Sequence, residues 1–234
     1  MARKSSELVW GVRKEGKSLW SRNAVRGQSV RGERKKRIGR IEWRNWNPWK
    51  SKVAAAILAS SSKPDLLLPK RGSTCLYLGA SSGGTVSHIH DIVCGSENHL
   101  EGQVVAVEIS PRMVRDLVPL SETRPGLVPV LGDARNIPEI SPFLRSKASW
   151  IHQDLSMPDQ AINFVKITSA LLASGGVGLL SLKAASERAS QGSDTSRFDI
   201  AEKILMEADL DLIEKIDISN FEDQHVIFVC KSSY

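Results

Sequence analysis

A short apolar run that ends in a small, glycine-rich turn constrains the fold of this chain more than any other stretch. The run Leu76–Leu78 leads into Gly79-Ala80-Ser81-Ser82-Gly83-Gly84-Thr85, and a helix-compatible segment follows. Glycine and serine let backbone N–H groups approach a polar ligand closely, and a helix N-terminus adds a positive dipole. The stretch predicts a parallel strand that passes into a helix beside a nucleotide-like ligand, although such turns also occur for packing alone.

Strand-like and helix-like segments alternate from this turn to the C-terminus. The predicted strands are residues 74–78, 103–109, 127–131, 149–154 and 176–183, and the predicted helices are 85–93, 112–122, 159–172 and 196–208. The last two strands, 211–218 and 225–231, are joined by a loop too short for a helix, so one strand must run antiparallel. The predicted fold class is α/β, with a Rossmann-like, doubly wound sheet of seven strands.

The first 52 residues form a basic segment on a mildly acidic body. They contain 16 Lys and Arg against 4 Asp and Glu, whereas the remainder contains 16 against 22, and five of the six tryptophans also lie in this segment. Strands are expected at 7–13 and 17–22, with extensions at 29–31 and 40–46, and an exposed charged loop at 32–37. Basic charge with interleaved aromatics suits nucleic acid, but a solvated cationic face over core tryptophans would look the same. We expect an N-terminal β-subdomain over 1–46 and a second domain over 47–234.

A helix is predicted from about Trp49 to Ser61, with Asn47 as its N-cap and Pro48 at its first position. Lys50 and Lys52 lie near its N-terminus, where their charge opposes the helix dipole. A local rule broken in this way is a reason to suspect function.

The remaining composition points to a soluble protein. The chain contains no 18-residue apolar run, so we expect no membrane association and a cytoplasmic location, or a nucleolar one if the source is a eukaryote. Its three cysteines lack the spacing of metal ligands, and we interpret them as buried thiols: Cys75, Cys94 and Cys230.

Polar residues stand at the carboxyl ends of successive predicted strands, where ligands bind in such sheets. Glu108 can accept hydrogen bonds from both hydroxyls of a ribose, and Asp133 from an adenine amino group. Asp154 and Lys183 end the next two strands. The turn after the first strand is not G-x-G-x-x-G and carries no phosphate-binding lysine, so an adenosine with a small charged group fits best. S-adenosylmethionine is such a ligand.

Several blocks of the chain resemble fibrillarin. Residues 47–57 are similar to the N-P-x-x-S-K-L-A-A-A-I block, and residues 76–88 to L-Y-L-G-A-A-S-G-T-T-V-S-H. Further blocks match in order at 106–110, 133–135 and 158–160. The resemblance runs from about Arg22 to the C-terminus and is closest to the archaeal fibrillarin-like branch. It implies S-adenosylmethionine-dependent 2′-O-methylation of ribose in rRNA and tRNA. It also implies a box C/D guide ribonucleoprotein with a Nop-type scaffold protein and a kink-turn-binding protein.

The resemblance also assigns residues. The family's Lys-Asp-Lys-His group falls on Lys52, Asp154, Lys183 and His225. The implied cofactor contacts fall on Gly79, Ala80, Gly84, Thr85, Glu108, Ile109, Asp133, Ala134, Asp154, Leu155, Ser156 and Met157. Gly84 replaces a threonine of the family block and Met157 a glutamine, so weaker or differently shaped cofactor binding is expected, but not its loss. A bulky Trp49 stands at a variable position of the block.

The expected chemistry is removal of a proton from a ribose 2′-OH as it attacks a methyl group. Lys183 is the candidate base, Asp154 would orient both lysines, and Lys52 would stabilise developing negative charge on the oxygen. His225 would contact the RNA backbone, shuttle a proton, or be purely structural. We interpret His88, His90 and His152 as structural.

Two other functions stay open at this point. One is methylation of a protein glutamine, and the other is a catalytically weak, structural subunit of the ribonucleoprotein.

Overall fold

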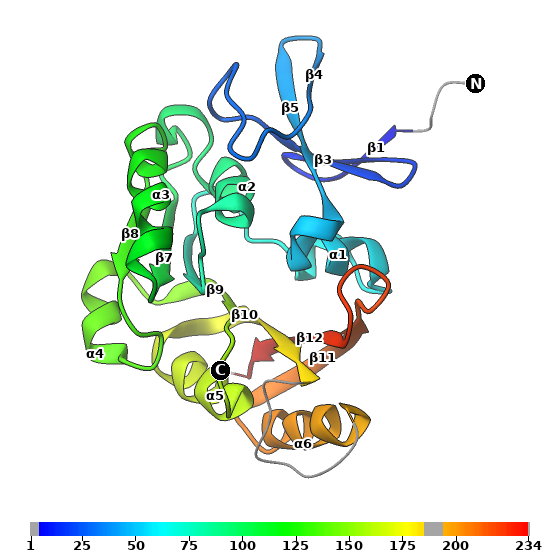
Figure 1. Ribbon diagram of the computed structural model, residues 1–234, viewed down its shortest axis with the longest axis vertical. Coiled ribbons are helices and arrows are strands. Elements are labelled where there is room, and N and C mark those ends of the chain that lie inside the picture. Colours follow the sequence, from blue (N-terminus) through cyan, green and yellow to red (C-terminus); the bar gives the residue numbers. More distant parts are fainter. Residues whose placement is uncertain (1–4, 185–193, 234) are drawn as a thin grey trace.

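The computed structural model describes residues 5–184 and 194–233 and contains two β-sheets (Figure 1). The first sheet is antiparallel, with the order β1-β2-β3-β5-β4. Its strands are β1 (Ser5–Val9), β2 (Val12–Glu15), β3 (Ser18–Arg22), β4 (Lys35–Ile38) and β5 (Ile41–Trp46). The last strand ends where the predicted N-terminal subdomain ends, at Trp46, and the division into two domains stays a prediction.

Three expectations about this sheet are wrong. The strand predicted over 7–13 is interrupted by a turn at Trp10 and Gly11, where Gly11 has φ +80°, and it forms β1 and β2. Residues 29–31 form no strand, whereas the charged run expected as a loop provides β4. β4 pairs with β5 alone, and the charged side chains on such an edge strand discourage pairing with another chain.

The second sheet has seven strands in the order β11-β12-β10-β9-β6-β7-β8. β6, β7, β8, β9 and β10 run parallel, and β12 is antiparallel to both β10 and β11, which confirms the predicted α/β sheet. The strands are β6 (Thr74–Leu78), β7 (Gln103–Glu108), β8 (Leu127–Leu131), β9 (Ala148–Asp154), β10 (Leu172–Lys183), β11 (Leu210–Asp217) and β12 (His225–Ser232).

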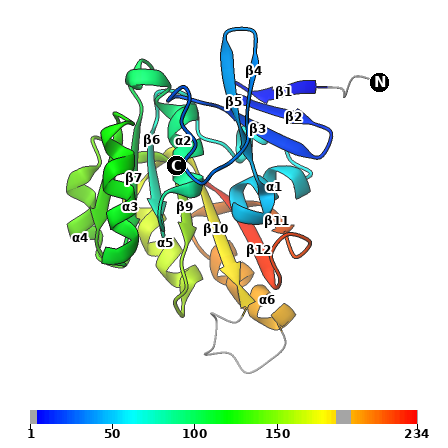
Figure 2. The ribbon, with the colours of Figure 1, turned by 45° about the horizontal axis from the view of Figure 1, so that its top comes forward.

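Helices cover both faces of this sheet. The helices are α1 (Lys52–Ala59), α2 (Gly84–Val93), α3 (Pro111–Glu122), α4 (Ile137–Ile140), α5 (Gln160–Leu171) and α6 (Asp194–Met206). One core cluster joins α1, α2 and α3 to one face, and two others join α4, α5 and α6 to the opposite face. α1 and α2 lie between the two sheets (Figures 1 and 2). No helix of the described segments is long and apolar enough to cross a membrane.

The predicted helix over 49–61 is two elements. A 3-10 turn, η1 (Pro48–Lys50), comes first, and the Asn47 side chain accepts a hydrogen bond from the backbone N–H of Trp49. Ser51 is the N-cap of α1, and its hydroxyl accepts from the Ala54 N–H. Lys50 therefore ends the short turn, where a cation is favourable, and Lys52 alone stands at a helix N-terminus.

A buried ionic cluster connects the first sheet to α2. Arg44 of β5 is fully buried and donates to the Asp91 carboxylate at 2.6 and 3.1 Å. It also donates to Glu33 at 2.7 Å and to the Ser87 hydroxyl at 3.2 Å. Arg124 contacts the second Asp91 oxygen at 3.2 Å. The two positive and two negative charges balance one another, as burial requires.

Candidate active site

A cavity of about 170 Å³ opens at the carboxyl ends of β6, β7, β8 and β9. Eight of the twelve predicted cofactor residues line it: Gly79, Glu108, Ile109, Asp133, Ala134, Leu155, Ser156 and Met157. We call it the cofactor cavity. The structure therefore brings these eight residues together at one cavity, while their role in cofactor binding stays a prediction.

Glu108 is held in place by the turn that opened the sequence analysis. One carboxylate oxygen accepts from the Ser81 N–H at 2.7 Å and the other from the Ser110 N–H at 2.9 Å. Each oxygen can accept a further hydrogen bond, because a carboxylate offers about four acceptor sites. The geometry fits the ribose of an adenosine, whose two adjacent hydroxyls require paired acceptors.

Asp133 has a neighbour that the sequence reasoning gave no role. Arg135 contacts both Asp133 oxygens, with its Nε at 3.0 Å from each, and its backbone N–H donates at 2.9 Å. These hydrogen bonds lower the pKa of Asp133 and keep it ionised. Arg135 also lines the cavity, so the acceptor predicted for an adenine amino group is fixed in orientation by a cation.

Gly79 allows the floor of the cavity to form. Its φ is +83°, and an added Cβ would lie 2.0 Å from the Asp154 carbonyl oxygen. No other residue fits there, because the ends of β6 and β9 approach too closely. The backbone of Asp154, one of the catalytic candidates, therefore lies directly beside the cofactor cavity.

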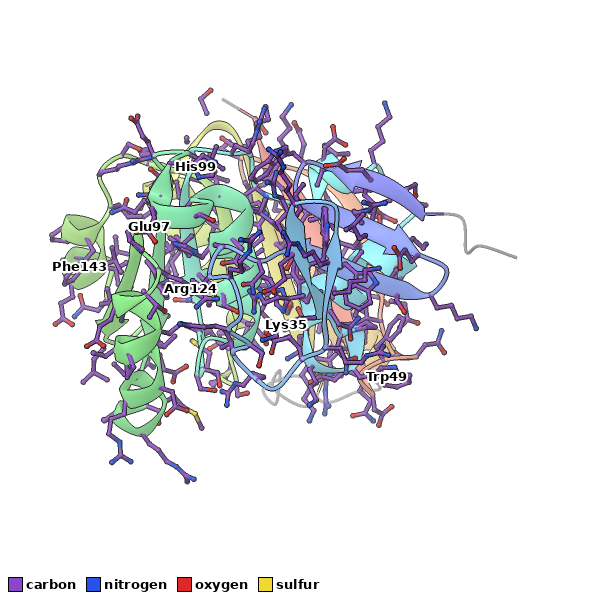
Figure 3. All side chains as sticks on the ribbon, turned by 90° about the horizontal axis from the view of Figure 1, so that it is seen from above. Lys35, Trp49, Glu97, His99, Arg124 and Phe143 are labelled. Carbon is purple, nitrogen blue, oxygen red and sulfur yellow. The ribbon has the colours of Figure 1, made fainter. Side chains whose placement is uncertain are left out.

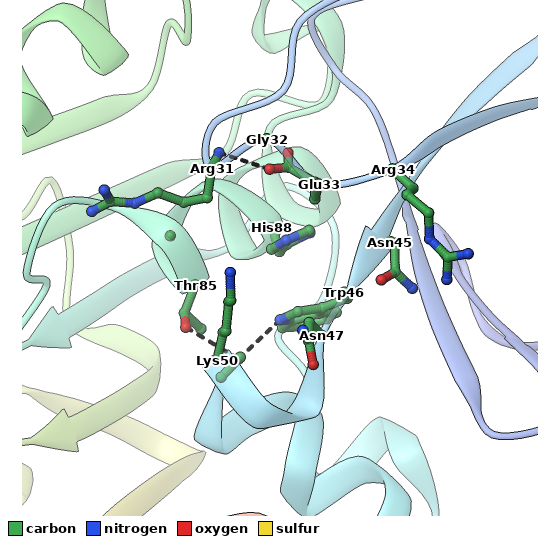
Figure 4. Close-up of a pocket in the computed structure, with 12 residues that line it drawn as sticks. Arg31, Gly32, Glu33, Arg34, Asn45, Trp46, Asn47, Lys50, Thr85 and His88 are labelled. Atoms are coloured by element: carbon green, nitrogen blue, oxygen red, sulfur yellow. Dashed lines mark hydrogen bonds between the residues drawn. The ribbon is translucent and has the colours of Figure 1, made fainter.

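Ala80, Gly84, Thr85 and Asp154 do not line the cofactor cavity as the other candidates do. Ala80 is buried beneath the turn. Gly84 and Thr85 begin α2 and line a second cavity of about 250 Å³, which lies under the N-terminal sheet (Figure 4). We call it the basic cavity, because Arg31, Arg34 and Lys50 also line it.

Lys52 and Asp154 form the centre of the candidate catalytic group. The Lys52 Nζ lies 2.9 and 3.1 Å from the two Asp154 oxygens and 3.3 Å from a Glu222 oxygen. Burial lowers the pKa of Lys52, but Asp154 and then Glu222 more than offset this, and the pKa is raised overall. Lys52 therefore stays protonated and positively charged, while its role in stabilising negative charge stays a prediction.

The expectation that Asp154 orients both lysines holds for Lys52 only. Lys183 is exposed at the end of β10, and in residues 5–184 and 194–233 its side chain makes no ion pair. The β10 register places Ser181 beside Asp154 and Lys183 beside His225. Since alternate residues of a strand share a face, Lys183 projects on the same side of the sheet as Asp154.

His225 is turned inward. Its ring is buried, its Nδ1 lies 2.7 Å from the Asp223 carbonyl oxygen, and its Nε2 lies 3.4 Å from Glu222. Both ring nitrogens are therefore occupied by the loop between β11 and β12. The position favours the structural interpretation of His225 over direct contact with an RNA backbone.

Two residues of the site received no role from the sequence. Glu222 joins Lys52 to His225 through a single carboxylate oxygen. Ser51 accepts from the Trp46 indole at 2.9 Å and from the Thr85 hydroxyl at 3.1 Å. The serine before α1 is a recognisable cap signal, but nothing local marks Glu222, because its partner Lys52 is far away in the chain.

His88, His90, His152 and the three cysteines are buried, which agrees with their structural interpretation. His152 donates to or accepts from Ser181 at 2.8 Å, and burial and the Lys52 charge lower its pKa to about 3. His88 is stacked on Trp46 and bonded to Ser21 at 2.6 Å. All three cysteines are buried and free, and burial raises the pKa of each to about 12. Within the described segments no group of His, Cys, Asp or Glu could hold a metal ion.

The fold is that of an S-adenosylmethionine-dependent methyltransferase. This class is defined by the strand order, the single antiparallel strand next to the sheet edge and the cavity at the strand ends. Comparison with known proteins narrows this class. A family model described as Fibrillarin matches residues 2–234. A fibrillarin-like rRNA/tRNA 2′-O-methyltransferase of Thermococcus sibiricus (strain DSM 12597 / MM 739) is 38% identical over 211 residues, which cover 90% of this chain and 88% of the relative. The chain belongs to the fibrillarin family.

Solved structures agree with this assignment. A fibrillarin pre-rRNA processing protein of Methanococcus jannaschii has a TM-score of 0.88 and 32% identity, covering 100% of this chain and 99% of that one. Aeropyrum pernix fibrillarin, solved with natively bound S-adenosyl-L-methionine, has a TM-score of 0.78 and 30% identity, covering 94% and 92%. A fibrillarin from a fibrillarin/Nop5p complex has a TM-score of 0.82 and 28% identity, covering 98% and 100%.

Proposed function

We propose that this chain is an S-adenosylmethionine-dependent methyltransferase that modifies the ribose 2′-oxygen of rRNA and tRNA. The observation that carries the proposal is the Lys52–Asp154 pair at 2.9 Å, placed where the Asp154 backbone meets Gly79 at the cofactor cavity. A cation fixed beside a ligand cavity suits a reaction in which an alcohol oxygen gains negative charge. The names of the curated relatives support rRNA and tRNA as the substrates.

The cofactor cavity suits S-adenosylmethionine, which when bound supplies a methyl group on a positively charged sulfur. Glu108 would accept from the two ribose hydroxyls, and Asp133 from the adenine amino group. The exposed side chain of Ile109 offers apolar surface for a base. Asp154 places a negative charge between the cavity and Lys52, which favours a cationic ligand.

The proton of the 2′-hydroxyl must leave as the oxygen attacks, because an alcohol is a poor nucleophile. Lys183 is our candidate base, since its Nζ has no carboxylate partner among the described residues and projects on the face that carries Asp154. Lys52 would donate a hydrogen bond to the 2′-oxygen, and Asp154 would hold the Lys52 ammonium in position.

The decisive experiment is single-turnover methyl transfer with Lys183→Ala, in a complex reconstituted with scaffold protein, guide and target RNA. Methyl transfer is expected to be lost while calorimetry shows cofactor affinity within about twofold of wild type. Lys166→Ala, which removes an exposed lysine of α5, is the matched control and should be fully active.

An unchanged rate for Lys183→Ala would rule out Lys183 as the base. Label found in protein and not in RNA would favour a glutamine methyltransferase. A wild-type complex that binds cofactor but transfers no methyl group would identify a structural subunit.

We also propose that the chain works in a ribonucleoprotein. The fibrillarin/Nop5p complex supports a Nop-type scaffold protein as its partner. A box C/D guide RNA would then select the target by base pairing, and a kink-turn-binding protein would hold that guide. Under this arrangement the chain itself reads the RNA by shape and backbone and not by sequence.

A further inference from the structure

The Glu222 carboxylate contacts Lys52, and the proposed reaction gives this contact no role. Glu222 lies in the loop between β11 and β12, which passes beside α1 (Figures 1 and 2). Its Oε1 lies 3.3 Å from the Lys52 Nζ and 3.4 Å from the His225 Nε2. A carboxylate at this position affects every step that uses the Lys52 ammonium.

The contacts of Lys52 use all of its hydrogen-bond donors. An ammonium group has three N–H donors and no acceptor. Three carboxylate oxygens surround the Lys52 Nζ, two from Asp154 at 2.9 and 3.1 Å and one from Glu222 at 3.3 Å. With one N–H directed at each oxygen, no donor is left for a substrate. A ribose 2′-oxygen can therefore bind to Lys52 only if one of these three contacts is given up.

The contact with Glu222 is the weakest of the three. It is the longest, and the Glu222 side chain is 44% exposed, compared with 24% for Asp154 and 16% for Lys52. Exposed ion pairs contribute little to stability, because water takes the place of the lost partner. Asp154 instead holds Lys52 with both of its oxygens. Glu222 is therefore the partner that a substrate oxygen displaces most easily.

A Glu222 carboxylate that stayed on Lys52 would also oppose the reaction. The 2′-oxygen gains negative charge beside Lys52 as it attacks, and two negative charges near one ammonium repel each other. Asp154 carries the same charge, but its backbone borders the cofactor cavity, where a positively charged cofactor would offset it. Release of Glu222 therefore favours the developing charge on the oxygen.

The loop that carries Glu222 has a fixed backbone. The N–H groups of Phe221 and Glu222 donate to the Ile218 carbonyl oxygen at 2.8 and 3.0 Å. The Phe221 ring packs against the main core cluster and meets the ring of Trp49, which is labelled at the edge of the molecule in Figure 3, with centroids 5.4 Å apart. Release of Lys52 therefore requires only a rotation of the Glu222 side chain, and the carboxylate stays close to His225 and to solvent.

We propose that the Glu222 carboxylate occupies the binding position of the substrate 2′-oxygen, and that this oxygen displaces it from Lys52 when the target strand enters. The 2′-oxygen then accepts an N–H of Lys52, and its own proton points away from Lys52 toward a base. No bond is made or broken in this exchange. The inference rests on the proposed function, since it names the group that the substrate of that reaction must displace.

The test measures how much the 2′-oxygen contributes to binding and needs no methyl transfer. The complex is reconstituted with scaffold protein and guide RNA, with S-adenosylhomocysteine in place of the cofactor. The Kd is measured for two target RNAs, which carry a hydroxyl or a hydrogen at the 2′ position of the selected nucleotide. The ratio of the deoxy Kd to the hydroxyl Kd should be about 2- to 5-fold larger in Glu222→Ala than in wild type, because the oxygen no longer displaces an exposed ion pair.

Two further variants separate this exchange from a general change of charge. Glu222→Gln keeps the size of the side chain without its charge, and its ratio should also exceed that of wild type. Asp223→Ala removes an exposed carboxylate from the same loop, one residue further on, and is the matched control. Its ratio should equal that of wild type. Thermal melting confirms that each variant is folded.

An unchanged ratio in Glu222→Ala would overturn the proposal. A smaller ratio would also overturn it, because Glu222 would then hold Lys52 in position for the substrate and not compete with it. Failure of the proposed function is seen separately, as absence of methyl transfer to RNA by the wild-type complex supplied with S-adenosylmethionine.

Discussion

Replacement of Arg44 by methionine should destabilise the whole protein, because Arg44 is the centre of the buried ionic cluster. Its side chain is 0% exposed, and it donates to Asp91 at 2.6 Å and to Glu33 at 2.7 Å. Methionine fills much of the same volume but provides no charge and no hydrogen-bond donor. Asp91 would keep the Arg124 contact at 3.2 Å and the His90 Nδ1 contact at 3.3 Å, both on one oxygen, and the Ser87 hydroxyl would lose its donor.

The magnitude follows from the burial of both partners. Removing one member of a buried ion pair costs ~3–5 kcal/mol in the free energy of unfolding, since the remaining charge stays buried without a partner. For a chain of this size, each kcal/mol lowers the melting temperature by about 2–4 °C. We therefore expect a decrease of roughly 6–20 °C at neutral pH.

Circular dichroism melting over a range of pH tests both the size of the destabilisation and its cause. Burial raises the pKa of Glu33, but hydrogen bonds from the Val30 N–H, Arg44 and the Arg31 N–H lower it from 4.5 to about 2. A depressed carboxyl pKa stabilises the folded state above about pH 4.5, and this stability is lost as the pH falls toward 2. The difference in melting temperature between wild type and Arg44→Met should therefore become smaller as the pH falls from about 4.5 toward 2.

Arg37→Met is the matched control, because Arg37 is exposed on β4 and donates only to the nearby Gly39 carbonyl. Its free energy of unfolding should change by less than about 0.5 kcal/mol. A melting temperature for Arg44→Met within 2 °C of that control would refute the reasoning.

Two predictions concern the cofactor. Glu108→Ala removes both ribose acceptors and should weaken S-adenosylmethionine binding roughly 10- to 100-fold by calorimetry. Glu139→Ala, which removes an exposed carboxylate of α4, is the control. Unchanged affinity for Glu108→Ala would show that Glu108 does not bind the ribose. Gly84 lines the basic cavity and is a cofactor contact by the family resemblance alone, and an added Cβ there would meet only Arg31, at 3.7 and 3.9 Å. If the cofactor reaches this position, Gly84→Thr should strengthen its binding about 2- to 10-fold by returning a hydroxyl. Equal calorimetric affinities for Gly84→Thr and wild type would show that the glycine does not weaken the site.

The strand-end residues were predictable because the sheet topology is encoded locally. Glu108 and Asp133 each follow an apolar run of strand length, Asp154 ends a strand-length run of mixed character, and parallel strands bring their carboxyl ends to one edge. The antiparallel β12 was also predictable, because the loop after β11 has no room for a crossover helix. These inferences need only the periodicity of the apolar residues and the lengths of the loops between the strands.

The contacts between charged groups were not predictable in the same way. Arg44 meets Asp91 across 47 positions of the chain, and Lys52 meets Asp154 across 102. A buried cation and an exposed one look identical in sequence, so the charged N-terminal segment could not be divided into structural and binding residues. The same ambiguity concealed β4, whose lysines and arginine look like a loop.

Ser51 explains why the N-terminal sheet matters to the chemistry. Its hydroxyl is the meeting point of the Trp46 indole, which ends that sheet, and the Thr85 hydroxyl, which begins α2 after the glycine-rich turn. The same hydroxyl caps α1, so the position of the next residue, Lys52, is tied to both. The catalytic cation is thus placed relative to the cofactor turn by a contact from the basic subdomain. A shift of the small sheet, for example through loss of Arg44, would therefore reach Lys52 through the Trp46–Ser51 hydrogen bond.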